Sequence, residues 1–194
     1  MADLNFPGAK GWDDEVRDSP YRLRFELGGE THGTDTVTRF IRAFDRAREI
    51  TSSVLPPKAR TYAVVKTFRV LHFRTLHKRG FDPLPVLAEW AEPARTNDPD
   101  SVSAYCRSFD ITHNTIMRDV LIWCPVAAEM DIKPRISVHP YFFAPDHKIL
   151  IHIYDDRGMD VISTHPDKLL PLYKSHESWL LDYDRKRMRK AFGS

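Results

Sequence analysis

Apolar and polar side chains alternate along two neighbouring stretches in the C-terminal half of the chain, Lys148–Tyr154 and Met159–Ser163. A period of two is typical of β-strands, and the residues between the stretches, Asp156–Gly158, are of the types that form tight turns. The pattern therefore predicts a β-hairpin with a charged three-residue turn. Gly158 tolerates the positive φ that closes such a turn, and either of the two aspartates that begin at Asp155 can accept hydrogen bonds from the backbone N–H groups that follow.

Further strands and helices are predicted from the same kinds of pattern. Alternation, or a run of β-branched and aromatic residues, predicts strands at Tyr21–Leu27, Tyr62–Phe68, Ser103–Phe109 and Arg135–Phe143. Apolar residues at helical spacing predict helices from Asp35 or Thr36 to Val54, from Pro83 to Trp90, from Asn114 to Met130 and from His165 to the end of the chain. Strands and helices first alternate and then give way to a three-strand meander. This order predicts an α+β or mixed α/β fold, with a central, largely antiparallel sheet flanked by helices.

Length and composition indicate one globular domain. The 194 residues are 42% hydrophobic and 29% charged, which is ordinary for a folded protein with one sizeable core. We therefore expect residues 1–194 to form a single domain, with irregular structure over about the first 18 residues. No signal sequence or bilayer-spanning window is visible, so we expect a cytoplasmic protein without a membrane partner. Cys106 and Cys124 lie outside any zinc-binding spacing and are expected to be buried thiols.

The lengths of two loops predict which side chains share a face of the meander. If the first loop has four residues, beginning at Ala144, and the turn has three, then His139 faces His152 on the neighbouring strand. Tyr154 likewise faces Asp160. One face of the sheet is then expected to gather these four side chains beside the charged turn.

This face is the candidate site, because histidine and carboxylate together can act as general acid and base or bind a divalent metal. The catalytic candidates are His152, Asp155, Asp156, Arg157 and Asp160, and the binding candidates are His139, Tyr154, Asp155, Asp156 and Arg157. The chain has no phosphate-binding Gly-x-x-x-x-Gly-Lys-Ser/Thr, no Gly-x-Ser-x-Gly and no His-Glu-x-x-His motif, which removes most of the support for a nucleotide triphosphatase, a serine hydrolase or a zinc protease. We expect no metal and no cofactor.

Basic residues form two groups. Arg39, Arg42 and Arg46 fall opposite the apolar positions of the first long helix and predict a solvated, partly paired surface. The window Ile50–Phe81 contains no acidic residue, and its candidate basic patch consists of Lys66, Arg69, Arg74, Lys78 and Arg79. Together with interleaved phenylalanines, this patch could bind phosphate backbones and stack on bases.

Several segments resemble a bacterial family of domains of unknown function that is marked by a Tyr-Asp-Asp-Arg-Gly signature. The signature lies at Tyr154–Gly158 and the likeness continues to Ile162. The other matching segments are Leu23–Gly28, Phe40–Ala47, Leu170–Tyr173 and Trp179–Arg185. The resemblance covers most of the chain, except Arg69 to Val102, and implies no established activity. Small soluble bacterial proteins of this kind often accompany contact-dependent toxins as immunity proteins.

The sequence favours a non-enzymatic protein that binds a protein partner, such as a toxin domain, because no catalytic signature is present. The alternative is a hydrolase acting on a phosphorylated or nucleotide-like substrate. It would use Asp155, Asp156 or Asp160 as base or metal ligand. Arg157 would hold an anion, and His152 would assist. A third hypothesis is a nucleic-acid-binding module that uses the basic patch.

Overall fold

The chain folds around a seven-stranded sheet. The computed structural model describes residues 12–29, 36–69, 71–78, 84–92 and 104–193. The strands in this part of the chain are β1 (Arg22–Glu26), β2 (Tyr62–Thr67), β3 (Val86–Glu92), β4 (Ala104–Asp110), β5 (His139–Ala144), β6 (Ile149–Ile153) and β7 (Gly158–Ser163). Their order is β1-β7-β6-β5-β2-β4-β3, and every neighbouring pair is antiparallel. The predicted α+β class and the C-terminal meander, β5-β6-β7, are confirmed.

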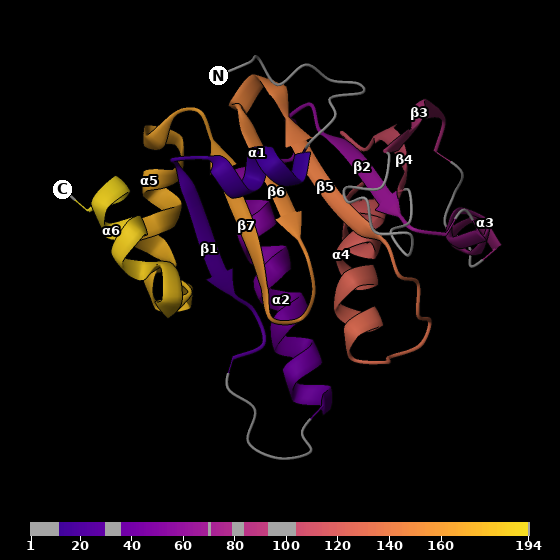
Figure 1. Ribbon diagram of the computed structural model, residues 1–194, viewed down its shortest axis with the longest axis horizontal. Coiled ribbons are helices and arrows are strands. Elements are labelled where there is room, and N and C mark those ends of the chain that lie inside the picture. The colour runs from indigo at the N-terminus through magenta and orange to yellow at the C-terminus, as the bar shows by residue number, and fades with distance from the viewer. Residues whose placement is uncertain (1–11, 30–35, 70, 79–83, 93–103, 194) are drawn as a thin grey trace, which may run out of the picture.

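Helices lie on both faces of the sheet. They are α1 (Trp12–Asp18), α2 (Thr36–Val54), α3 (Leu71–Lys78), α4 (Thr115–Glu129), α5 (Pro166–Ser175) and α6 (Arg185–Phe192), with short 3-10 turns at η1 (Pro145–His147), η2 (Glu177–Trp179) and η3 (Asp182–Asp184). Figure 1 shows α2 and α4 behind the sheet and α1 crossing in front of it. Within the described residues, none of these helices is long and apolar enough to cross a membrane.

The two faces of the sheet carry different side chains. The face toward α2, α4 and α5 supplies the large core, with residues such as Leu23, Phe25, Val65, Phe142, Ile151, Ile153 and Val161. The face toward α1 supplies a smaller apolar cluster around Val16, formed by Val64, Cys106, Tyr141, Phe143, Leu150 and Ile162. The first face can contribute most of the hydrophobic stabilisation, because that scales with the apolar area removed from water. The apolar cluster on the second face is smaller, so other positions of that face carry polar side chains.

Local sequence explains where helix α2 ends and where helix α4 begins. Helix α2 ends at Val54, just before Pro56, which lacks the N–H that a helix needs. Helix α4 begins after Asn114, whose side chain accepts a hydrogen bond of 2.8 Å from the backbone N–H of Met117. Both predicted helices are confirmed.

The predicted helix from Pro83 to Trp90 is wrong. Residues 86–92 form β3, which pairs with β4 along the edge of the sheet. Pairing of Trp90 with Cys106 and of Ala91 with Tyr105 satisfies backbone groups that a short isolated helix would leave to water. Tertiary pairing therefore decides the structure of this segment.

Both ends of the chain also differ from expectation. Residues 12–18, predicted to be irregular, form α1. The predicted continuous C-terminal helix is broken between α5 and α6, because the chain becomes extended at Leu180, where it forms a β-bridge with Phe25. The backbone N–H of Leu181 then donates to the carbonyl of Arg24 at 2.8 Å. The C-terminal segment thus covers the edge of β1, which would otherwise present unpaired backbone groups.

Candidate functional site

The meander brings the predicted face together, although with a different register. His152 faces Tyr141 rather than His139, and Asp160 faces His152 rather than Tyr154. Both predicted pairings are wrong by two residues, because the two loops occupy residues 145–148 and 154–157. In the first loop Lys148 adopts a left-handed conformation with φ 56°, and in the second Gly158 belongs to β7 rather than to the turn. A shift of two residues keeps every side chain on its face, so the predicted set remains on one side of the sheet.

The acids of the charged turn are tied to arginines. Asp155 accepts hydrogen bonds of 2.7 Å from the backbone N–H and from Nε of Arg157. This confirms that an aspartate organises the turn. Asp156 pairs with Nε of Arg39, which extends from α2. The two carboxylates are buried, whereas the Arg157 side chain is 70% exposed.

Gly158 is required for a reason that the sequence did not reveal. Its φ is not positive, so the predicted conformational reason is wrong. It pairs with Glu26 of β1, and a Cβ atom at this position would lie 2.7 Å from the carbonyl oxygen of Phe25 and would also clash with the hydroxyl of Tyr154. Close packing of β1 and Tyr154 therefore excludes a side chain here.

The arginines on α2 hold the end of β1 instead of forming a solvated surface. Arg42 donates to the carbonyl of Gly28 at 2.9 Å, and Arg46 donates to the carbonyl of Glu26 at 3.1 Å. Arg39 donates to the carbonyl of Gly29 in addition to its pair with Asp156. The expected pairing is confirmed for Arg39, but the expected solvated surface is wrong, because these half-buried side chains reach the carbonyl groups at the end of a neighbouring strand.

A pocket of about 320 Å³ lies on the face of the sheet toward α1, and we call it the sheet-face pocket. Its lining consists of Asp13, Val16, Arg17, Arg22, Arg24, His152, Tyr154 and Asp160. The structure therefore divides the predicted site residues into two groups and leaves His139, at the start of β5, outside both. His152, Tyr154 and Asp160 reach the pocket, whereas Asp155, Asp156 and Arg157 belong to the turn and do not line it.

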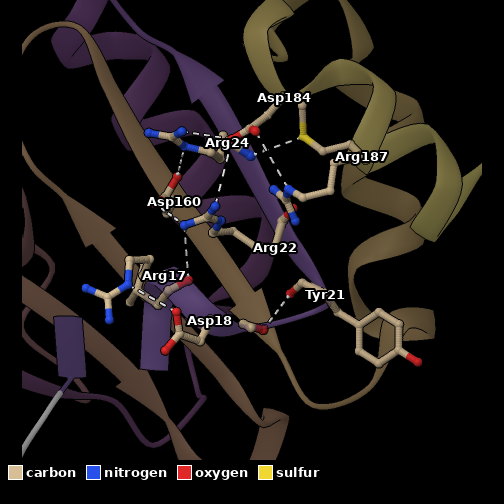
Figure 2. A network of polar contacts seen from close by, with 11 residues as sticks. Arg17, Asp18, Tyr21, Arg22, Arg24, Asp160, Asp184 and Arg187 are labelled. Carbon is tan, nitrogen blue, oxygen red and sulfur yellow. Dashed lines mark hydrogen bonds and ion pairs between the residues drawn. The ribbon is translucent and has the colours of Figure 1, made fainter. Parts of the chain in front are cut away.

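An ion network joins β1, β7 and the C-terminal segment beside the pocket (Figure 2). Arg24 donates to Asp160 at 3.0 Å and to Asp184 at 2.8 Å. Although burial opposes its charge, these two acids raise the pKa of Arg24 above its ordinary value. Burial raises the pKa of Asp160 in spite of Arg24, and it raises the pKa of Tyr154 to about 12. Arg24 and Asp160 thus form a buried charged pair next to a neutral phenol.

His152 is the histidine that lines the pocket. Its ring stacks on Tyr141 with centroids 4.2 Å apart. Burial lowers the pKa of His152 to about 4 in spite of the opposing charge of Asp13, and His139 and Lys66 add smaller lowering contributions. At neutral pH the imidazole is therefore neutral, and its buried Nε2 atom has no hydrogen-bond partner among the described residues.

The basic patch does not form as predicted. Lys66 is buried, and its Nζ lies 2.7 Å from both Asp13 and Glu92. Burial opposes the charge of Lys66, but these hydrogen bonds raise its pKa. Arg69, Arg74 and Lys78 are exposed, while Arg79 lies outside the described residues. Lys66 lies opposite His139 across β2 and β5, so its buried ammonium does not share an exposed surface with the other three.

Sequence reasoning missed most of the cations and acids around the pocket. Arg22 and Arg24 alternate along a predicted strand, so a shared face could have been inferred from the period of two. No sequence signal places β1 beside β7 or brings Asp13 and Asp184 to the same region. Within the part of the chain that the structure describes, no group of three histidine, cysteine or carboxylate residues has an arrangement suited to a metal ion.

Comparison with known proteins identifies a family. The model of a family described as a domain of unknown function (DUF3885) matches residues 7–184. No curated protein and no solved structure matches the chain. The match spans α1 to η3 and therefore includes the charged turn and every residue that lines the sheet-face pocket. The chain belongs to the DUF3885 family of domains of unknown function.

Proposed function

We propose that this chain acts by binding a protein partner rather than by catalysing a reaction. The observation that carries the proposal is the pairing of the acids in the Tyr-Asp-Asp-Arg-Gly segment. Asp155 is bonded to Arg157, and Asp156 is bonded to Arg39. A general base or metal ligand needs lone pairs that face a substrate, and these carboxylates face neighbouring arginines instead. We therefore assign them a structural role in shaping the hairpin.

The end of the β6–β7 hairpin is the recognition surface in this proposal. Asp155 fixes the guanidinium of Arg157 from one side, and Glu129 lies 3.9 Å from its Nη2. The exposed remainder of the group can form hydrogen bonds with an acidic side chain of a partner. Arginine on a rigid support is favoured in interface hot spots, because little conformational entropy is lost on binding. A toxin domain that the chain neutralises in the cytoplasm is the partner class we favour.

The test begins with purification of the tagged chain from its native host and identification of stoichiometric partners. Isothermal titration then gives Kd for the wild type, for Arg157→Ala and for Arg135→Ala. Arg135 is the matched control, because it is also exposed and also pairs with an aspartate, Asp131. We expect Arg157→Ala to weaken binding by about tenfold or more, which corresponds to about 1.4 kcal/mol, and Arg135→Ala to leave it unchanged.

Absence of a stoichiometric partner, or unchanged binding by a folded Arg157→Ala variant, would contradict this proposal. If the neighbouring gene encodes a secreted toxin, cells that produce the toxin alone should stop growing, and cells that also produce this chain should grow. Growth of the toxin-producing cells only when this chain is present would support the immunity role.

Hydrolysis of a phosphorylated or nucleotide-like substrate is the second candidate. The observation in its favour is that His152 faces Asp160 directly across two strands at the sheet-face pocket. However, Asp160 is already bonded to Arg24, and a histidine with a pKa of about 4 is a weak base. An activity of the purified protein on phosphate esters that disappears in a folded Asp160→Asn variant would favour catalysis over binding.

A further inference from the structure

Two neighbouring arginines of β1 differ in how well their charge is satisfied. Arg24 has carboxylate oxygens of Asp160 and Asp184 at 3.0 and 2.8 Å. Arg22 faces the same two acids, but at 3.8 and 3.9 Å, which is beyond hydrogen-bond distance. Its guanidinium donates to the carbonyl of Val16 at 3.3 Å. Only 13% of the Arg22 side chain is exposed, so water compensates for little of the difference.

The other acids at the pocket are already engaged with different cations. Asp13 lies 2.7 Å from Nζ of Lys66 and also bonds to the hydroxyl of Tyr141. Arg17, at the rim, pairs with Asp18 at 3.1 Å. Arg22 is therefore the cation of the pocket lining for which the described residues provide no carboxylate at hydrogen-bond distance.

Several buried nitrogen atoms around Arg22 also lack hydrogen-bond partners among the described residues. They are Nε of Arg22, Nε2 of His152, and Nε and Nη1 of Arg187. Burial, and then the charge of Arg22, lower the pKa of Arg187, as expected where positive charge exceeds negative charge. Three arginines share two carboxylates in this network (Figure 2). Buried unsatisfied donors of this kind mark positions where a water molecule or an ion belongs.

We propose that the sheet-face pocket binds a small anion through a phosphate or carboxylate group, with Arg22 as the principal ligand and Nε2–H of His152 as a second donor. Arginine suits both groups, because its planar guanidinium can donate two parallel hydrogen bonds to their oxygens. A volume of about 320 Å³ accommodates inorganic phosphate or a small organic acid. In the tautomer that carries its proton on Nε2, the neutral histidine adds a donor without adding charge. This site is separate from the protein-binding surface at Arg157.

The experiment titrates the protein with sodium phosphate and, separately, with sodium acetate, at constant ionic strength kept with sodium chloride. The Nε–H resonance of Arg22 in the NMR spectrum and the melting temperature are followed. We expect a saturable shift of that resonance and a rise in Tm of about 5 °C or more at a hundredfold excess over Kd. Saturation by phosphate alone identifies a phosphate site, and saturation by acetate alone identifies a carboxylate site.

Two variants locate the binding. Arg22→Gln should weaken it by about tenfold or more, because a charged donor is lost, while Arg135→Gln should bind like the wild type. If Arg22→Gln does not fold, His152→Phe takes its place, with a smaller expected loss. Signals that change linearly with every salt, chloride included, or equal Tm rises in wild type and Arg22→Gln, would overturn the proposal. Failure here leaves the partner-binding test at Arg157 unaffected.

Discussion

The charged turn ends the β6–β7 hairpin and the sheet-face pocket lies on one face of it, yet the buried charges of the two regions are paired to different degrees. In the turn, Asp155 and Asp156 each have an arginine within hydrogen-bond distance. In the pocket, Arg22 and His152 each have a buried nitrogen atom without a hydrogen-bond partner among the described residues. A buried group that is fully paired stabilises one conformation, whereas a buried group without a partner reduces stability unless something binds to it. The difference indicates that the turn is structural and that the pocket is where a ligand would act.

The largest expected effect is at Asp156. Replacing it by asparagine removes the charge that balances Arg39, and breaking a buried pair in this way should cost about 3 kcal/mol of unfolding free energy. Asp131→Asn is the control. Its carboxylate also pairs with an arginine but is 76% exposed, compared with 6% for Asp156. Urea denaturation should show a change of no more than about 0.5 kcal/mol for Asp131→Asn. Equal effects of the two substitutions would mean that the turn is not held by its buried pair.

An intermediate effect is expected from pH at His152. Its pKa is about 4 in the folded protein and 6.5 in the unfolded chain, so the unfolded state binds the extra proton as pH falls between these values. This contribution to stability is complete above the unfolded pKa and is lost as pH falls toward the folded one. Between about pH 7.5 and about pH 5 the wild type should therefore lose about 2 kcal/mol more than His152→Phe.

His152→Phe is a suitable reference, because a phenyl ring can keep the stacking on Tyr141 without titrating. Stability measured at both pH values gives the difference between the two proteins. The same pH dependence in both would show that His152 is charged or solvated in the fold and would remove it from the proposed anion site.

A smaller effect is expected at Gly158. Alanine there should cost about 1 kcal/mol, because its Cβ would meet the carbonyl oxygen of Phe25 and the hydroxyl of Tyr154. Adding Tyr154→Phe removes the hydroxyl contact but keeps Cζ, which would lie 2.9 Å from the new Cβ, so it should recover only part of the loss. Thermal unfolding of the single and double variants measures both values. No loss in Gly158→Ala, or no recovery in the double variant, would show that the strands separate without cost and that β1 does not constrain the turn.

The hairpin and the shared face could be predicted from sequence because both depend on a period of two. The alternation around His152 specifies which side chains lie together, and this result survived an error of two residues in each loop. The same alternation along β1 would have placed Arg22 and Arg24 on one face. Local patterns of this kind are sufficient for strands and for faces within a meander.

The pocket could not be predicted because its parts come from distant segments. Asp13, Arg22 and His152 line one pocket, and Asp184 pairs with the arginines beside it, only because β1 lies beside β7 and the C-terminal segment covers β1. The sequence also could not show why position 158 is a glycine, because the atoms that exclude a side chain there include a carbonyl oxygen of the distant strand β1. The helix predicted from Pro83 to Trp90 was wrong, because pairing with β4 outweighs the local helix signals.

Comparison of two arginines tests the central claim most directly. Arg39 serves the turn and Arg22 serves the pocket, and their side chains have similar exposures of 17% and 13%. Each is replaced by glutamine, and the free energy of unfolding is measured in urea without added phosphate or carboxylate. Arg39→Gln should cost about 3 kcal/mol, because it leaves Asp156 buried and unpaired, whereas Arg22→Gln should change stability by less than about 1 kcal/mol or increase it. Equal and large losses in both variants would contradict the distinction between a satisfied turn and an unsatisfied pocket.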